Sequence, residues 1–255
     1  MSTAAPHTDG AAAFRTFGPM VSPAISTDLP HAVVLVSGGL DSCVTAAVAA
    51  AGHRLSFLHV DYGQRTRSRE LLAFTQIADH FSVEERRIVD VGYLRQIGGS
   101  SLTDPDLEVE SGSDIEEQAV PSTYVPFRNA NLLAIAVSWA EVIGATRIYL
   151  GAHEVGAPYP DCRGEFFDAF NALVRVGTRP QTRIEVVTPL LTLDKAGVVS
   201  RGIELGAPLH LTWSCYVAED HPCGSCHSCH SRRAGFENAG VADPLLRAPD
   251  PLMRG

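Results

Sequence analysis

Lysine is almost absent from this 255-residue chain, in which Lys195 stands alone beside 19 arginines. Positive charge is scarce overall, because 20 basic side chains face 29 acidic ones and the formal net charge is −9. Proteins that bind nucleic acid mainly through its phosphates need a basic surface, so this charge argues against that class. No run approaches the roughly 18 consecutive apolar residues of a membrane-spanning helix.

Secretory features are missing as well. Residues 1–30 are rich in Ala, Pro, Thr and Gly and have neither a basic start nor an apolar core, so we expect a disordered leader. We therefore expect a cytoplasmic protein. Four of the six cysteines lie within 15 residues near the C-terminus, a spacing that favours a metal site over disulfides in an unexported protein.

One glycine turn near the N-terminus organises the chain. Its spacing matches neither the Walker loop nor the dinucleotide fingerprint. An apolar run at 33–36 predicts a buried parallel strand, and the Ser-Gly-Gly turn at 37–39 leads into an alanine-rich helix over 43–51. The glycines permit close backbone approach, while the hydroxyls of Ser37 and Ser42 and the first helical N–H groups converge on one anion site.

This turn resembles the signature of the ATP pyrophosphatases, whose loop holds the phosphates of ATP during attack on the α-phosphorus. The resemblance implies that Asp41 helps to bind Mg²⁺. The alternative is a strand-to-helix turn without a ligand. The residues that the resemblance assigns to nucleotide binding are Val36, Ser37, Gly38, Gly39, Leu40, Asp41 and Ser42.

Strands and helices alternate along the next 150 residues or so, which predicts an α/β fold with a doubly wound, mostly parallel sheet of about five strands. We expect this domain over 31–208, a small zinc-binding segment over 209–240 and a tail over 241–255. Further strands are expected at 55–60, 86–91, 146–150 and 184–190, and helices at 69–81, 124–143, 165–176 and from Thr192, a possible cap.

The pattern breaks down between residues 98 and 123. Seven carboxylates follow Thr103 without a Lys or Arg among them. A long polar connection inside a compact domain is usually an active-site lid, and a solvated acidic loop is the alternative for its middle.

The ends of the predicted strands supply the candidate ribose site. Asp61 and Tyr62 follow the second strand, 22 residues beyond Gly39, where doubly wound folds place a ribose-binding carboxylate. A polar loop that merely begins at Asp61 is the alternative.

Two further groups are candidate ligand contacts. Arg128 and Asn129 lie at the positive end of a predicted helix. Asp161 and Arg163 follow a rigid proline next to the predicted crevice. Lys195 lies near another helix N-terminus, where it either binds a phosphate or remains in solvent.

The C-terminal cysteines are separated by seven, two and two residues. Four closely spaced thiolates suit tetrahedral zinc, and such a closed site is structural. An iron–sulfur cluster is the second choice, and a nearby histidine (His221, His227 or His230) is a possible replacement for one ligand. The predicted ligands are Cys215, Cys223, Cys226 and Cys229.

Seven motifs in register resemble the 7-cyano-7-deazaguanine synthase family, also called QueC. They are Ser-Gly-Gly-Leu-Asp-Ser at 37–42, Asp-Tyr-Gly-Gln-Arg at 61–65, Ser-Ser-Leu-Thr at 100–103, Val-Pro-x-Arg-Asn at 125–129, Tyr-Pro-Asp-Cys-Arg at 159–163, Thr-Pro-Leu with Asp-Lys at 188–195, and the cysteine cluster.

The resemblance implies that ATP, Mg²⁺ and ammonia convert 7-carboxy-7-deazaguanine to the nitrile, through an adenylated acid and an adenylated amide. It implies a structural Zn²⁺ and small-molecule partners, without direct contact to nucleic acid or membrane, and it leaves a homodimer open. The implied catalytic residues are Ser37, Asp41, Ser42 and Lys195, and the implied substrate-binding residues are Arg128, Asn129, Tyr159, Asp161 and Arg163.

Two departures from the family pattern keep alternatives open. Phe127 stands where the family commonly has glycine, and the segment 155–158 before Tyr159 is short. One alternative is a paralogue that adenylates the same carboxylate and transfers it to another amine on a protein or metabolite. The others are a tRNA-modifying ATP pyrophosphatase and a non-enzymatic nucleotide-sensing or zinc scaffold module.

Overall fold

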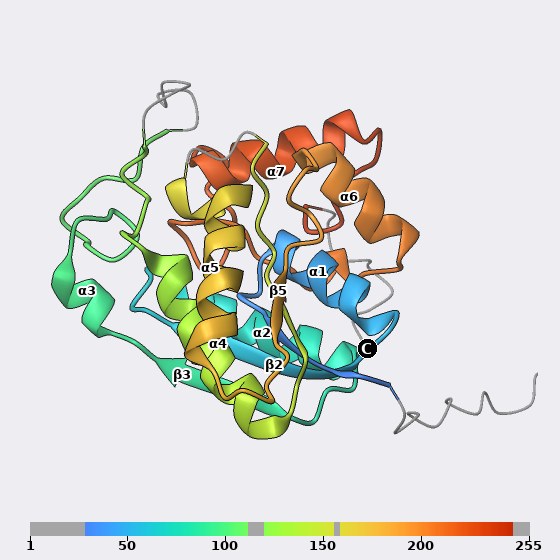
Figure 1. Cartoon of the computed structure of the whole chain (residues 1–255). Helices are drawn as coiled ribbons and strands as arrows, with labels where there is room; N and C mark the ends of the chain where they lie inside the picture. The colour runs from blue at the N-terminus through green and yellow to red at the C-terminus, as the bar shows by residue number, and fades with distance from the viewer. Residues whose placement is uncertain (1–28, 112–119, 156–158, 247–255) are drawn as a thin grey trace, which may run out of the picture.

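A single five-stranded sheet lies at the centre of the molecule (Figure 1). The computed structural model describes residues 29–111, 120–155 and 159–246. Every strand pairing is parallel and the order is β3-β2-β1-β4-β5, which confirms the predicted doubly wound sheet. The strands are β1 (His31–Leu35), β2 (Arg54–Asp61), β3 (Arg86–Asp90), β4 (Arg147–Tyr149) and β5 (Glu185–Val187).

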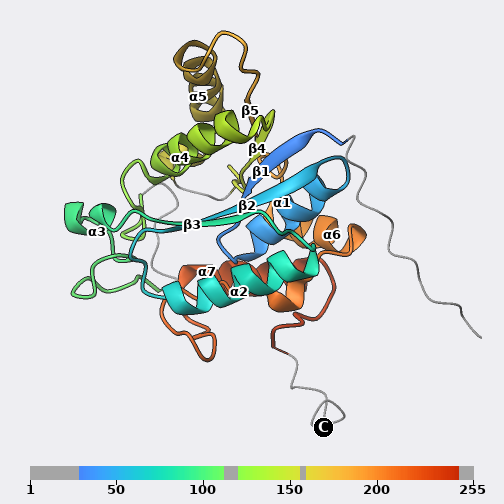
Figure 2. The same cartoon turned by 90° about the horizontal axis from the view of Figure 1, so that it is seen from below.

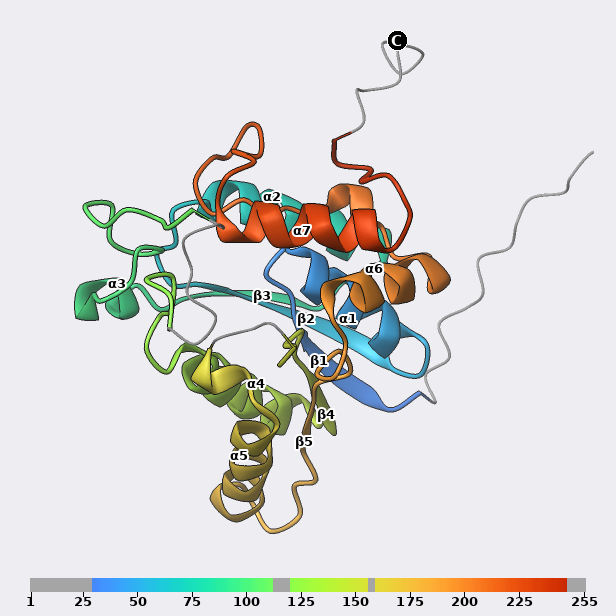
Figure 3. The ribbon, with the colours of Figure 1, turned by 90° about the horizontal axis from the view of Figure 1, so that it is seen from above.

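Helices cover both faces of the sheet (Figures 2 and 3). Side chains of β1 alternate between two cores, with Val33 and Leu35 in the α4 and α5 core and Ala32 and Val34 in the α1 and α2 core. The helices are α1 (Leu40–Ala50), α2 (Arg67–His80), α3 (Tyr93–Ile97), α4 (Arg128–Ile143), α5 (Gly164–Gly177), α6 (Lys195–Glu204) and α7 (His227–Asn238). None of those in the described ranges has the length and apolarity to cross a bilayer.

Helix α4 begins at Arg128, so the prediction that it opens at Tyr124 is wrong. Phe127 has a φ of 57° and therefore lies in the left-handed region, which ends any helical path from residue 124. This backbone conformation explains why glycine suits the position, because a side chain costs about 1–2 kcal/mol there. The first turn is supported from outside, since Asn129 N donates to Asp161 Oδ2 at 2.9 Å.

Asp194, not Thr192, caps helix α6. Its Oδ1 accepts a hydrogen bond from Gly197 N at 2.8 Å, the geometry of an N-cap. Lys195 is consequently the first residue of α6, which confirms its expected place near a helix N-terminus.

The first part of the predicted lid packs against the loop after β2. Ser100, Ser101 and Thr103 are buried. Arg65 Nε donates to Ser101 O at 2.7 Å. Residues 112–119 lie outside the described residues, so the lid function of 98–123 stays a prediction.

Gly202 brings α6 against α1 without a side chain between them. A Cβ at this position would lie 2.8 Å from Val44 Cγ2 and 2.9 Å from Leu209 Cδ2, and both neighbours are buried. We expect Gly202→Ala to lower the free energy of unfolding by about 1–2 kcal/mol, because overpacking outweighs the gain of about 1 kcal/mol in helix propensity.

Urea unfolding measures this difference. Gly177→Ala is the control, because a Cβ at Gly177 would have no atom within 4 Å outside its own helix. If both variants are as stable as the parent chain, α6 is not tightly packed on α1.

Candidate active site

A cavity of about 230 Å³ opens at the carboxyl ends of β1 and β4. The strand order reverses between these two strands, and ligands of open α/β folds bind at that point. Predicted site residues that line the cavity are Val36, Ser37, Gly39, Leu40, Asp41, Ser42, Tyr62, Arg128, Asn129 and Lys195. Among the lining residues that sequence reasoning did not select are Glu70, Trp213, Tyr216 and Arg232.

The glycine turn forms a compact loop held by its own hydroxyls. Gly39 N donates to Ser37 Oγ at 3.2 Å, and Ser42 Oγ donates to Gly39 O at 3.0 Å. Gly38 has a φ of 93°, and a Cβ there would lie 2.5 Å from Glu70 O. Only glycine fits this position, and the close approach fixes the loop against the first turn of α2.

Asp41, Lys195 and His153 form a charged cluster at the mouth of the loop. Lys195 Nζ lies 2.8 Å from both carboxylate oxygens of Asp41 and 3.1 Å from His153 Nε2. Burial by itself would raise the pKa of Asp41, but the Lys195 ammonium and the His153 contact outweigh it and hold the pKa well below its usual range. Asp41 is therefore ionised at neutral pH, as a ligand of Mg²⁺ must be.

His153 is a member of this cluster that sequence reasoning did not select. Its Nδ1 donates to Val155 O at 3.1 Å, and its Nε2 lies 3.1 Å from Lys195 Nζ. The available sequence signal was its place just after a strand, at the edge where ligands bind.

The contact between Tyr62 and Arg128 is a second polar feature of the cavity. Arg128 Nη1 donates to Tyr62 Oη at 3.1 Å, and the guanidinium carbon lies 5.3 Å from the centre of the ring. Burial would lower the pKa of Arg128, but Tyr62 and Tyr159 raise it above its usual value. Burial raises the pKa of Tyr62 to about 12. The cavity thus contains a fixed cation beside an aromatic ring, a suitable surface for a planar acidic ligand.

Glu70, in the first turn of α2, is a second carboxylate in the cavity. Thr66 Oγ1 donates to its Oε1 and Gln64 Nε2 to its Oε2, each at 2.9 Å. Burial raises the pKa of Glu70 to about 7, although these two hydrogen bonds and Arg128 act in the opposite direction. The predicted amphipathic helix over 69–81 gave no reason to single it out.

Asp61 and Arg163 do not line the cavity. Asp61 accepts from Gly63 N at 2.9 Å and pairs with Arg67 at 3.1 Å. Arg163 is exposed and lies 3.8 Å from Glu165. Their roles in ribose and substrate binding stay predictions.

Asp161 and Tyr159 also lie outside the cavity lining. Asp161 is 4% exposed, and besides accepting from Asn129 N through its carboxylate, it accepts from Asn129 Nδ2 through its carbonyl at 2.8 Å. Tyr159 Oη lies 2.8 Å from Thr123 Oγ1. These contacts hold the start of α4, and with it Arg128, in place, whereas the predicted recognition of a base by Asp161 is untested.

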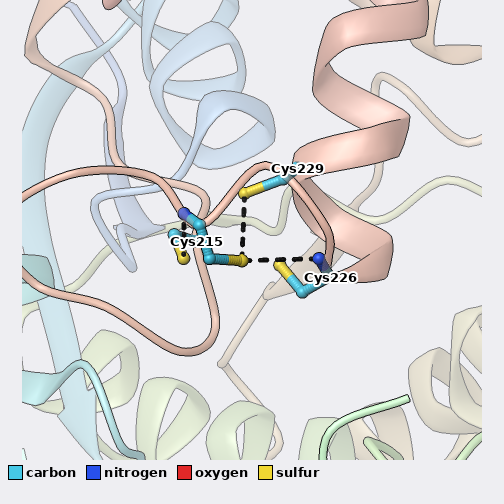
Figure 4. Close-up of side chains that lie close together, drawn as sticks. Cys215, Cys226 and Cys229 are labelled. Carbon is cyan, nitrogen blue, oxygen red and sulfur yellow. Dashed lines mark hydrogen bonds between the residues drawn. The ribbon is translucent and has the colours of Figure 1, made fainter. Parts of the chain in front are cut away.

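The four predicted cysteine ligands come together, and three of them, Cys215, Cys226 and Cys229, are labelled in Figure 4. Their sulfur atoms all lie within 4.8 Å of one another, and the Cys223 and Cys229 sulfurs are 3.9 Å apart. Tetrahedral zinc with bonds of about 2.3 Å separates its sulfurs by about 3.8 Å, so the cysteines fit such a metal. Backbone N–H groups of Val217, Ala218 and Cys223 point at Cys215 Sγ at 3.3–3.4 Å and favour the thiolate.

No histidine of the described chain joins this group of four sulfurs. His221 is largely exposed, with its side chain paired to Asp220. The segment is partly helical, because Cys226 is the N-cap of α7 and Cys229 lies in its first turn.

The cysteine segment contacts the glycine loop and the start of α6. Trp213 N donates to Gly38 O at 2.9 Å, which satisfies a carbonyl of the loop. A Cβ at Gly235 on α7 would lie 2.5 Å from Lys195 Cγ, so α7 packs directly on the start of α6. The first contact connects the cysteine segment to the glycine loop, and the second connects it to Lys195, which lines the cavity.

Comparison with known proteins identifies the family. The family model described as "Queuosine biosynthesis protein QueC" matches residues 31–240. The chain belongs to the QueC family. Proteins named 7-cyano-7-deazaguanine synthase are similar to this QueC-family chain: those of Chlorobium phaeobacteroides and Chlorobaculum parvum are 53% identical over 216 residues, 84% of this chain and 95% of theirs. That of Chlorobium limicola is 51% identical over the same length.

Solved structures overlap only loosely with this chain. NAD⁺ synthetase from Burkholderia pseudomallei is 15% identical with a TM-score of 0.41, covering 84% of this chain and 75% of that protein. NMN synthetase from Francisella tularensis is 13% identical with a TM-score of 0.43, covering 88% and 90%. The family assignment depends on the sequence matches alone.

The cysteine cluster predicts a measurable metal dependence. We expect Cys226→Ser to remove most of the bound metal and to lower the melting temperature, because a four-thiolate site contributes strongly to local folding. Metal analysis of the purified chain and thermal unfolding with and without a chelator measure both effects.

The control is His221→Ala, whose exposed ring lies outside the sulfur group. It should retain the metal content and melting temperature of the parent chain. A stable Cys226→Ser variant with full metal content would show that these cysteines are not the ligands.

Proposed function

We propose that this chain is an enzyme of the ligase class that converts 7-carboxy-7-deazaguanine, ammonia and ATP to 7-cyano-7-deazaguanine, with release of AMP and pyrophosphate. The observation that carries the proposal is the QueC family match over 31–240, with relatives of that name at 51–53% identity. The cavity supports it, because the Ser-Gly-Gly-Leu-Asp-Ser loop of the family lies at its wall.

The loop is the proposed phosphate site. Its backbone N–H groups lie at the start of α1, where the helix dipole favours negative charge. Asp41 would hold Mg²⁺, which neutralises phosphate charge during transfer. Lys195 would contact the phosphate oxygens, and such electrostatic stabilisation is the main catalytic contribution expected in phosphate chemistry.

The deazaguanine acid is the proposed occupant of the Tyr62 and Arg128 side of the cavity. Arg128 offers donors to a carboxylate, and the rings of Tyr62 and Tyr216 line the same space. Activation of the acid followed by ammonia gives the amide, and activation of the amide oxygen followed by its loss gives the nitrile. Exclusion of water protects the adenylated acid from hydrolysis, which is the role proposed for the lid.

Zn²⁺ is the proposed occupant of the cysteine site, with a structural role. Four thiolates leave no open coordination position. The cluster would hold Trp213 and α7 behind the loop and Lys195. A cytoplasmic location and a homodimer stay predictions.

The decisive experiment incubates the purified chain with ATP, Mg²⁺, ammonium and 7-carboxy-7-deazaguanine. We expect the mass of the nitrile and about two AMP per nitrile, one for each activation. Mass spectrometry and AMP quantification measure both. An amide as the end product with about one AMP would instead support transfer to a different amine.

Asp41 is predicted to be essential for activation. We expect Asp41→Asn to reduce AMP formation by at least about 100-fold with the fold retained, because the variant loses the anionic ligand for Mg²⁺ and leaves Lys195 without its partner. Circular dichroism checks the fold. The control, Asp79→Asn, removes only an exposed pair with Arg86 and should keep full activity. An active Asp41→Asn variant would remove Asp41 from the mechanism.

A further inference from the structure

Two acidic residues that line the cavity differ in the charge of their hydrogen-bond partners. Asp41 is paired with the Lys195 ammonium at 2.8 Å. Glu70 has no Lys or Arg within ion-pair distance among the described residues and is held only by the neutral donors of Thr66 and Gln64. Carboxylates whose surroundings separate their pKa values in this way divide acid–base roles between them.

We propose that Glu70 is the proton acceptor for the amine substrate, taking a proton from ammonium inside the cavity so that neutral ammonia attacks the adenylated acid. This proposal rests on the proposed function. It adds the residue that makes the nitrogen nucleophilic, which the phosphate loop does not supply.

The position of Glu70 suits this step. Its backbone oxygen lies directly against Gly38 of the proposed phosphate loop, and Glu70 lines the same cavity as Ser37, Gly39 and Asp41 of that loop. Both oxygens are fixed by side chains that are only 1% and 3% exposed, those of Thr66 and Gln64. Gln64 is fixed in turn by Tyr62 N, which donates to its Oε1 at 3.0 Å.

The surroundings also suit an ammonium ion. Tyr216 lines the same cavity, and aromatic faces attract cations, whereas Arg128 already lies over the Tyr62 ring and Arg69 over the Trp213 ring. The charged groups that act on Glu70 are Arg128 from α4 and Asp61 from the end of β2. A base with a pKa close to the working pH is the most effective proton acceptor, and Glu70 satisfies this condition.

One N–H bond of ammonium breaks and its proton passes to a Glu70 oxygen, which leaves a lone pair on nitrogen. That pair forms the C–N bond at the acyl carbon, and the C–O bond to AMP breaks with its electrons on the phosphate oxygen. The second proton of the nitrogen passes to water as the amide forms, and Glu70 later returns its proton to water.

Glu70→Gln tests the proposal, because it keeps the size of the side chain and removes the basic oxygen. With ammonium as the amine we expect amide and nitrile formation to fall by about 10²–10⁴-fold. The exchange of pyrophosphate into ATP that depends on the acid, measured without ammonium, should fall far less. The limb of the pH–rate profile that rises near neutrality should disappear.

Hydroxylamine separates proton transfer from structural support. It is a much weaker base than ammonia and is uncharged at neutral pH, so it needs no proton acceptor before attack. We expect Glu70→Gln to form the hydroxamate at a rate within a few-fold of the parent chain. Glu70→Asp, which keeps the charge, should retain the pH dependence even if its rate is low.

Glu219→Gln is the matched control. Glu219 also contacts the start of α2, accepting from Ser68 N at 3.0 Å, but it is exposed and does not line the cavity. It should leave the ammonium KM and the pH profile unchanged.

The outcomes are distinguishable. Equal losses of Glu70→Gln with ammonium, with hydroxylamine and in pyrophosphate exchange would overturn the proposal and make Glu70 a support of the phosphate loop. Full activity of Glu70→Gln with ammonium would overturn it as well. A parent chain that forms no nitrogen-containing product would instead overturn the proposed function.

Discussion

The pair between Asp41 and Lys195 joins positions 154 residues apart and holds the cavity together. Each residue lies in the first turn of its helix, α1 and α6, so one ion pair fixes two helix N-termini at the same place. The N-termini of α1 and α6 and the Lys195 ammonium place positive potential at the glycine loop, beside the carboxylates of Asp41 and Glu70. This local potential would help an acidic chain with a single lysine to bind a polyanionic nucleotide.

The cysteine segment makes this arrangement rigid. α7 presses on the start of α6 at Gly235, and Trp213 completes the hydrogen bonding of the loop at Gly38. These contacts are far apart in sequence and few in number, and a metal held by the four sulfurs between Cys215 and Cys229 would give the segment a stability that its small core does not provide. Such a metal would bear on the chemistry through the position of Lys195, without contact with the substrate.

The sequence predicted what depends on local pattern and missed what depends on distant partners. All five strands and the phosphate loop follow from apolar runs and a glycine turn, which are local signals. The start of α4 did not follow, because it depends on Asp161, 32 residues away, and on a left-handed Phe127. Asp161 illustrates the same limit. Its motif indicated a functional residue, but only the structure shows that its carboxylate accepts a hydrogen bond from Asn129 N at the start of α4. Glu70 lay within a correctly predicted helix and became visible only when the fold placed it against Gly38.

A reaction that activates a carboxylate and then adds ammonia needs two incompatible electrostatic environments within a few ångströms. Phosphate transfer needs cations, which oppose the approach of ammonium, whereas generation of ammonia needs an anion free to accept a proton. Ion pairing separates these two environments in the cavity. The Lys195 ammonium holds the pKa of Asp41 low, so that carboxylate is ionised. Burial raises the pKa of Glu70 to about 7, and no Lys or Arg of the described residues lies within ion-pair distance of it. The same separation would serve the second half of the reaction, in which the amide nitrogen loses its protons as the nitrile forms. A carboxylate held by neutral donors beside the glycine loop would thus allow a single cavity to perform both activations.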